Sequence, residues 1–401
     1  MISRRRLISG VIGGVLTAMT AQNALAADTI KVGEINSYSK LPAFTVPYRN
    51  GWQLALEEIN AAGGINGKKI EVISKDDAGK PGEAVTAANE LVSKDGVSIL
   101  MGTFFSHIGL AVSDFAKQKK VVFVAAEPLS DAVTGAKGHD YVFRIRPPVI
   151  VQAAILANAA AKLPAKRWAT IAPNYEYGKS SVAAFKEKLS ALRPDVEWVD
   201  EQWPTLFKMD AGSTVQAISR AEPEAIFNVT FGSDLTKFVR EGSTRNLFEG
   251  RSVVSMLTGE PEYLDAMKDE APEGWIVTGY PEYSIDTPEH NAFKKSYEAK
   301  FNDYPRLGSI VGYSTMKATA AILAHAKSLA AEDLIAAGES TKFDTPLGEA
   351  SFRAVDHQST MGAYIGTTAL KDGKGVMVDW TYEDGEKYLP SAEEIKKQRG
   401  M

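Results

Sequence analysis

The sequence predicts an α/β fold of two lobes, each a parallel sheet flanked by helices, joined by several strands that form a hinge beside a cleft. Three observations predict it. Short β-branched runs alternate with helical stretches along most of the chain. This alternation is interrupted at Pro147 and Pro148, which end a strand, and then starts again. The remaining C-terminal segment is too short for a third domain, so we expect it to complete the two lobes.

The N-terminal segment is typical of a signal peptide. Arginines at positions 4–6 precede an apolar stretch over 7–19 and a small-residue run that ends at Ala26, where we expect cleavage. A membrane-spanning helix needs about 20 apolar residues, so this shorter stretch favours export over anchoring. The arginines also fit a twin-arginine signal, and the Sec and twin-arginine routes both stay open. We therefore expect a periplasmic protein.

The first lobe begins directly after this leader. The helix expected over 48–62 places Trp52, Ala55 and Ile59 on one face. We expect its parallel sheet to consist of five short runs, residues 30–35, 70–74, 97–101, 121–125 and 141–145.

The second lobe repeats this alternation after the prolines. Its predicted strands are residues 168–172, 196–200, 225–229, 253–257 and 275–279. Helices expected over 291–301 and 309–328 return to the first lobe, and short strands beyond Phe343 complete the second. The expected limits are therefore 27–147 with 280–345 for lobe 1, and 148–279 with 346–401 for lobe 2.

Composition and charge exclude several classes of function. The 401 residues include no cysteine, which excludes disulfides, thiolate metal sites and a cysteine nucleophile. Without the leader, 42 basic residues face 50 acidic ones, a balance that repels nucleic acid and anionic lipid. No two of the five histidines have the i, i+4 spacing of a helical zinc pair, and no nucleophile elbow or phosphate-binding loop is present. We expect no metal, no cofactor and no catalytic activity.

Residues 51–70 (GWQLALEEINAAGGINGKKI), followed by Asp76-Asp77 and the helix over 84–92, resemble the leucine/isoleucine/valine-binding proteins of bacterial ABC importers. The likeness extends to Gly102, Ser106, Ser113-Asp114 and Tyr177-Gly178. It implies the type I periplasmic binding protein fold, a small-molecule solute and a membrane permease as partners, and a monomer. A ligand-sensing subunit of a membrane receptor is an alternative in the same fold. A secreted α/β hydrolase is a less favoured one.

The first candidate binding residues lie at the ends of two first-lobe strands. Ser106 opens a helix, where exposed N–H groups and the helix dipole favour a carboxylate, although an ordinary helix cap explains it equally well. The resemblance implies that this serine holds the carboxylate of the ligand. Leu129, two residues after Glu127, replaces a threonine of the family. One hydroxyl is thereby lost, although the backbone N–H of Leu129 can still donate.

The remaining candidates are aromatic residues and one acid. Aromatic walls suit an apolar side chain or ring. The resemblance places such residues around the cleft, namely Phe44, Phe105, His107, Tyr177 and Phe231. It also implies that Glu260 holds the ammonium of the ligand. If Glu260 turns away, an acid without an amine, such as an aromatic acid, becomes the better ligand, unless Glu127 supplies the charge. The predicted ligand is thus a carboxylate-bearing solute, either an apolar amino acid or an aromatic acid.

Overall fold

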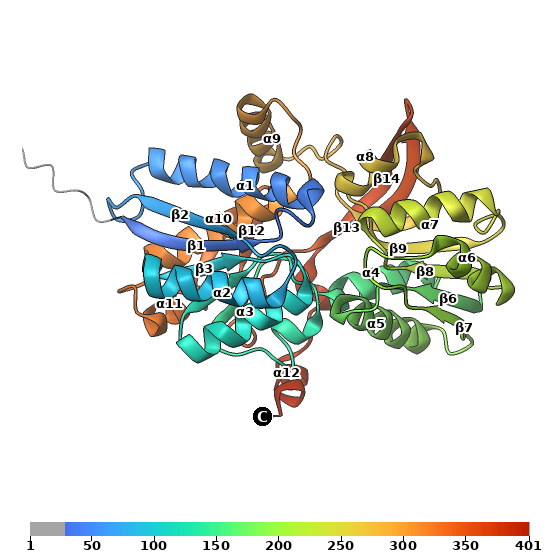
Figure 1. Cartoon of the computed structure of the whole chain (residues 1–401), viewed down its shortest axis with the longest axis horizontal. Coiled ribbons are helices and arrows are strands. Elements are labelled where there is room, and N and C mark those ends of the chain that lie inside the picture. Colours follow the sequence, from blue (N-terminus) through green and yellow to red (C-terminus); the bar gives the residue numbers. More distant parts are fainter. Residues whose placement is uncertain (1–28, 401) are drawn as a thin grey trace, which may run out of the picture.

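The computed structural model describes residues 29–400, so the predicted signal peptide lies outside the described residues. Two lobes lie side by side in Figure 1. The first contains a five-stranded parallel sheet in the order β2-β1-β3-β4-β5. Its strands are β1 (Ile30–Asn36), β2 (Ile70–Asp76), β3 (Ile99–Gly102), β4 (Val122–Ala125) and β5 (Val142–Arg144). Its early helical segments are α1 (Pro42–Ala61), α2 (Pro81–Glu90), η1 (Leu91–Asp95), α3 (Ser106–Lys119) and η2 (Asp131–Val133).

The second lobe contains a seven-stranded sheet in the order β14-β13-β10-β9-β8-β6-β7. Its parallel strands are β6 (Arg167–Ile171), β7 (Glu197–Gln202), β8 (Ala225–Asn228), β9 (Ser252–Gly259) and β10 (Ile276–Gly279). Its helical segments are α4 (Val149–Ala160), α5 (Glu176–Leu192), α6 (Ala211–Arg220), α7 (Gly232–Thr244), α8 (Pro261–Met267) and η3 (Lys268–Glu270). Both sheets are flanked by helices, and the predicted fold class is confirmed.

An antiparallel hairpin extends this second sheet. The sheet is therefore mixed, whereas the sequence predicted a parallel one. Strand β13 (Ala363–Lys371) pairs antiparallel with β10 and with β14 (Lys374–Glu383). The connecting residues Asp372 and Gly373 have φ angles of 51° and 73°. An Asp-Gly pair favours this two-residue turn because both residues tolerate positive φ.

The chain between β10 and β13 returns to the first lobe. It forms α9 (Pro288–Phe301), α10 (Leu307–His325), α11 (Ala331–Gly338) and the hairpin of β11 (Lys342–Thr345) with β12 (Gly348–Ser351). Strand β11 packs against α10. The hairpin of β11 and β12 continues past position 345, which the sequence suggested as the end of lobe 1. The chain ends in η4 (Gly385–Tyr388) and α12 (Ala392–Arg399).

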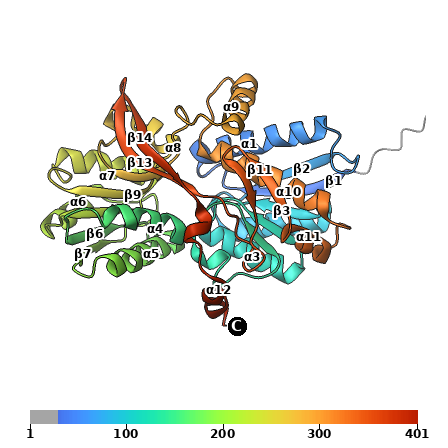
Figure 2. The ribbon, with the colours of Figure 1, turned by 180° about the vertical axis from the view of Figure 1, so that it is seen from behind.

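The lobes are joined on the face turned toward the viewer in Figure 2, where β13 runs diagonally between them. The end of β5 is bridged in parallel to the segment before β13, with Arg144 opposite Gln358. The buried Arg144 side chain donates to the Thr134 hydroxyl at 2.6 Å and to the Gln358 side chain. Gln358 in turn donates to the Arg146 carbonyl at 3.1 Å. These bonds fix the two crossing segments to each other.

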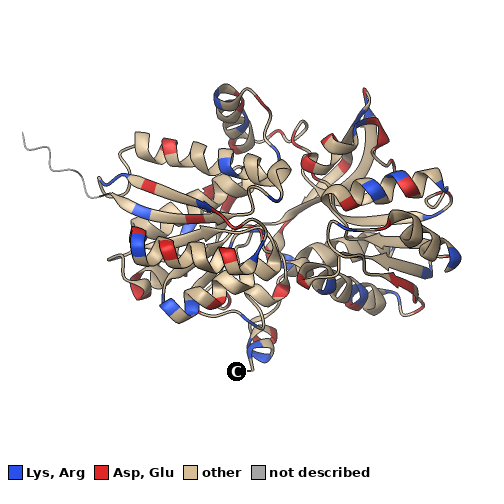
Figure 3. Ribbon diagram, in the orientation of Figure 1, with Lys and Arg blue, Asp and Glu red and all other residues tan. Residues whose placement is uncertain are grey.

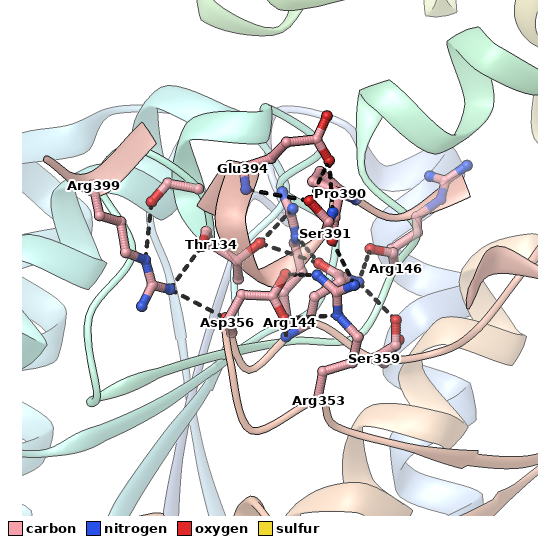
Figure 4. A network of polar contacts seen from close by, with 12 residues as sticks. Thr134, Arg144, Arg146, Arg353, Asp356, Ser359, Pro390, Ser391, Glu394 and Arg399 are labelled. Atoms are coloured by element: carbon pink, nitrogen blue, oxygen red, sulfur yellow. Dashed lines mark hydrogen bonds and ion pairs between the residues drawn. The ribbon is translucent and has the colours of Figure 1, made fainter. Parts of the chain in front are cut away.

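The C-terminal helix also contacts this hinge region, as Figure 4 shows. Arg399 of α12 donates to the Thr134 carbonyl at 2.8 Å. Arg353, in the crossing segment, donates to the Pro390 carbonyl just before α12 at 2.8 Å. The tail thus leaves the second lobe and ends against the first.

Close packing of α1 on α10 depends on glycine. A Cβ added at Gly312 would lie 1.9 Å from the Tyr48 carbonyl oxygen, and one at Gly51 would lie 2.1 Å from the Ser309 carbonyl oxygen. These approaches let the two backbones touch, which buries the side chains of both helices over the first sheet.

Gly312→Ala should therefore lower the free energy of unfolding by about 1–3 kcal/mol, because the new methyl group overpacks the helix interface. Denaturant unfolding measures this change. Gly82→Ala is the matched control, because an added Cβ there meets nothing within 4 Å. It lies in the first turn of α2 and should be neutral or stabilising by up to about 1 kcal/mol. Equal effects of the two substitutions would contradict the packing argument.

Candidate ligand-binding site

A cavity lies between the lobes, at the carboxyl ends of the parallel strands. Open α/β sheets place their ligands at this end. First-lobe residues follow β3, β4 and β5, and second-lobe residues come from the starts of α5 and α7 and from β9. The lining residues are Phe104, Ser106, Glu127, Leu129, Arg146, Tyr175, Tyr177, Phe231 and Leu257. Five of the nine candidate residues are therefore brought together here.

Ser106 opens α3 and connects it to the loop after β4. Its Oγ accepts the backbone N–H groups of Leu129 at 3.2 Å and Ser130 at 3.1 Å. The Leu129 N–H, which the sequence suggested as a donor to the ligand, is thus already used within the protein. Because a hydroxyl has one hydrogen and two lone pairs, the Ser106 hydroxyl keeps its hydrogen to donate.

Aromatic rings from both lobes meet at the cavity. The Phe104 ring lies 5.0 Å from that of Phe44 and 6.1 Å from that of Phe231 in the opposite lobe. Tyr177 lies edge-on to Phe231 at 5.8 Å. These separations are typical of favourable aromatic pairs. The hydroxyl of Tyr177 is buried and has no hydrogen-bond partner.

Three candidate aromatic residues lie behind this lining. Phe44 and Phe105 each contact Phe104 at 5.0 Å between ring centroids. His107 packs edge-on against Tyr175 at 5.3 Å, and burial lowers its pKa. These three side chains support the lining residues and are not part of the cavity wall.

A buried ion triad crosses from one lobe to the other beside the cavity. Arg146 donates through Nη1 to Glu127 Oε2 at 2.7 Å and through Nη2 to Glu260 Oε1. Glu127 follows β4 of the first lobe, and Glu260 precedes α8 of the second. Both carboxylate side chains are fully buried, and the Arg146 side chain is 6% exposed. One oxygen of each carboxylate has no partner.

Burial and charge shift the pKa values of all three groups. Burial raises the pKa of Glu260 to about 8, although Arg146 opposes this. Burial raises the pKa of Glu127 to about 6, again against Arg146. Burial also lowers the pKa of Arg146, but the charges of Glu260 and Glu127 outweigh it and raise this pKa above its ordinary value. One guanidinium therefore serves two carboxyl groups, of which Glu260 is largely protonated at neutral pH.

The position of Glu260 follows from an irregularity in β9. Leu257 has a φ of 68°, in the left-handed region that large side chains rarely adopt. Its N–H donates to the Thr278 hydroxyl at 3.0 Å, and the register between β9 and β10 shifts after Val277. Strained residues of this kind cluster at functional sites. As a result, Leu257 lines the cavity, while Glu260 lines a neighbouring cavity on the hinge side together with Arg146.

Sequence reasoning missed four lining residues, Phe104, Arg146, Tyr175 and Leu257. Arg146 carried the clearest signal, since an arginine just before two prolines at a strand end is exposed to the cleft once the crossover is recognised. Phe104 precedes Phe105, and Tyr175 lies two residues before Tyr177, both of which were singled out. Leu257 could not be found, because only the backbone geometry brings it to the cavity.

Over residues 29–400, no group of three or more His, Asp and Glu side chains is placed to hold a metal ion. The same residues include no helix with the length and apolarity that crossing a membrane requires. Figure 3 shows basic and acidic residues interspersed on both lobes.

The raised pKa values predict a dependence of stability on pH. The folded chain binds more protons at Glu127 and Glu260 than the unfolded chain, whose glutamates titrate near 4.5. Their contribution is fully present below about pH 4.5 and is lost as pH rises through about 6 for Glu127 and about 8 for Glu260.

Glu260→Gln should therefore reduce the loss of stability between pH 6 and pH 9, measured by denaturant unfolding at each pH. Glu83→Gln, at an exposed position in α2, is the control and should retain the wild-type slope. An unchanged slope in Glu260→Gln would show that Glu260 does not titrate in this range.

Comparison with known proteins shows relatives over most of the chain. A Leu/Ile/Val-binding protein homologue from Brucella suis is 26% identical over 332 residues, covering 78% of this chain and 80% of the relative. A leucine-, isoleucine-, valine-, threonine-, and alanine-binding protein from Pseudomonas aeruginosa is 23% identical, covering 86% of this chain and 91% of that protein.

Solved structures show the same architecture. A solute-binding protein of an ABC transporter from Rhodopseudomonas palustris, in complex with 3,4-dihydroxybenzoic acid, matches with a TM-score of 0.78 at 24% identity. The match covers 90% of this chain and 99% of that one. A branched-chain amino acid transporter substrate-binding protein from Streptococcus pneumoniae, in complex with isoleucine, matches with a TM-score of 0.76 at 25% identity. It covers 89% of this chain and 99% of its own.

The periplasmic binding protein family model matches residues 29–374. This range includes both sheets up to the start of β14 and every residue that lines the cavity. The resemblance seen in the sequence is thereby confirmed, and the chain belongs to the periplasmic binding protein family.

Proposed function

We propose that this chain is a periplasmic, non-catalytic solute-binding protein that captures a small carboxylate-bearing molecule with an apolar body and delivers it to the membrane permease of an ABC importer. The observation that carries this proposal is the cavity between the lobes. Aromatic and aliphatic side chains wall it, and the Ser106 and Tyr177 hydroxyls and the Arg146 guanidinium line it with hydrogen-bond donors. Such a composition, with few polar groups in an apolar site, is typical of small-molecule binding.

The donors fit a carboxylate in particular. The Ser106 hydroxyl retains its hydrogen, the Tyr177 hydroxyl has no partner, and a guanidinium has five N–H groups of which the two glutamates take two. Charge-assisted bonds from a guanidinium to a carboxylate are among the strongest hydrogen bonds in proteins. The names of several relatives and structural neighbours state a ligand, either aliphatic amino acids and threonine or benzoic acids, all of which carry a carboxylate.

Capture would proceed by a shift of the population between open and closed forms. In the open form the first lobe presents Ser106, Glu127 and Arg146, and the ligand binds there. Closure then brings Tyr177 and Phe231 of the second lobe against it. No covalent bond changes in this cycle. The closed form presents surfaces of both lobes to the permease at once, which lets the importer distinguish loaded from empty protein.

A thermal-shift screen of the mature chain tests this function with aliphatic amino acids, aliphatic acids and aromatic acids as ligands. A ligand present at 100 times its dissociation constant should stabilise the folded protein by about 2.7 kcal/mol. Stabilisation by sugars or metal ions, with no response to any carboxylate, would contradict the proposal.

Tyr177→Phe separates binding from folding. Removal of a buried hydroxyl without a partner should leave the unliganded protein as stable as the wild type or slightly more stable. Ligand affinity should fall by about 1–3 kcal/mol, because the donor to the carboxylate is lost. Isothermal titration calorimetry measures the affinity. Tyr263→Phe is the control, since the Tyr263 hydroxyl is also buried and unpartnered but does not line the cavity. Unchanged affinity in Tyr177→Phe would exclude this tyrosine from the site.

A further inference from the structure

We propose that Arg146 determines specificity by occupying the cationic position between the lobes, so that the site selects small carboxylates that lack an amino group. This inference rests on the proposed function, and it selects one ligand class among those that a carboxylate site could accept. The sequence suggested that Glu260 is free to hold an ammonium group, and the structure differs at that point.

The guanidinium already binds one oxygen of each acid that an ammonium group could use. Arg146 binds Glu127 of the first lobe at 2.7 Å and Glu260 of the second lobe through its other terminal nitrogen. Arg146 and Glu127 line the ligand cavity, whereas Glu260 lines only the neighbouring cavity on the hinge side. A ligand nitrogen in the first cavity therefore meets Arg146 before it meets Glu260.

An ammonium group would be a second cation beside this guanidinium. It would either repel Arg146 at close range or displace it from Glu127 and leave a fully buried arginine with one partner fewer. A carboxylate has neither difficulty, because the remaining N–H groups of Arg146 can donate to it. The local charge thus favours a ligand with an anionic head and no cationic one.

The rest of the lining agrees with this assignment. Leu129 contributes an alkyl group to the lining, and its N–H is taken by Ser106. Phe104, Phe231 and Leu257 offer no polar side-chain group to an amine. The unpartnered Oε1 of Glu127 is an acceptor in the lining. It can accept from a neutral hydroxyl, so hydroxylated acids fit as well.

Matched pairs of ligands that differ only in the amine test the proposal by isothermal titration calorimetry. The pairs are leucine with 4-methylpentanoate and phenylalanine with 3-phenylpropanoate. In the wild type, the acid without an amine should bind at least about tenfold more tightly than its amino acid. Arg146→Gln frees both carboxylates and should reverse this preference. Arg306→Gln is the control, because Arg306 also bridges the lobes, through Asp265 at 2.9 Å, but lies outside both cavities. It should retain the wild-type preference.

The pH dependence provides a second test that needs no arginine variant. Glu260 faces Arg146 from the crossing segment, Glu127 from the first lobe, Tyr177 from α5, and Glu262 and Tyr263 from its own helix. As pH rises through about 8, Glu260 ionises and cancels more of the Arg146 charge. Affinity for 3-phenylpropanoate should then fall by about threefold or more between pH 6.5 and pH 8.5. Glu260→Gln should abolish the fall.

The outcomes are distinguishable. Tighter binding of the amino acid in both pairs, or an affinity for 3-phenylpropanoate that rises with pH, would overturn the assignment of Arg146 and leave carboxylate capture intact. Failure of all four ligands to bind, while a sugar or a polyamine stabilises the protein, would overturn the proposed function and this inference with it. Tighter binding of the acids by the wild type and by Arg306→Gln, with reversal in Arg146→Gln, supports both.

Discussion

A buried arginine that both lobes share joins them beside the cavity. Arg146 lies in the segment that passes from one lobe to the other, and it binds a carboxylate on each side. Removal of one partner from a buried ion pair is costly, by about 3–5 kcal/mol, because it leaves an unpaired charge in a low-dielectric interior. Separation of the lobes at this point would likewise leave Arg146 without one partner until water solvates it. The triad therefore couples lobe position to the electrostatics of the cavity, and a ligand that binds beside it acts on both.

The fold explains why these groups meet. Parallel strands present their carboxyl ends at one edge of each sheet, and the crossover after β5 brings the two edges face to face. The helix starts at Ser106 and Tyr177 then lie on opposite sides of one cavity. The segment before β13 is held to the end of β5 through Gln358 and Arg144. Closure can therefore be a rotation about a defined hinge.

The sequence predicted the fold class from features that are local in the chain. The alternation of β-branched runs with helices and the two prolines at the crossover each have a short-range physical cause. The antiparallel pairing of β13 with β10 depends on contacts between distant segments, and no local pattern indicated it. Within the site, Ser106 was found because it follows a strand end and opens a helix, whereas Tyr177 and Phe231 were found through the family resemblance. Arg146 was read only as part of a crossover, and its two ion pairs depend on Glu127 and on the irregular geometry at Leu257 that positions Glu260.

The distance between the lobes is the most direct test that the Arg146 triad holds them together. The chain has no cysteine, so spin labels can be attached at Glu83→Cys in α2 and Lys237→Cys in α7, two exposed positions on opposite lobes. Double electron–electron resonance then measures the distribution of label distances without ligand. The account predicts a short-distance population in the otherwise wild-type chain that is lost when Arg146→Gln is added. Identical distributions in the two proteins would contradict it.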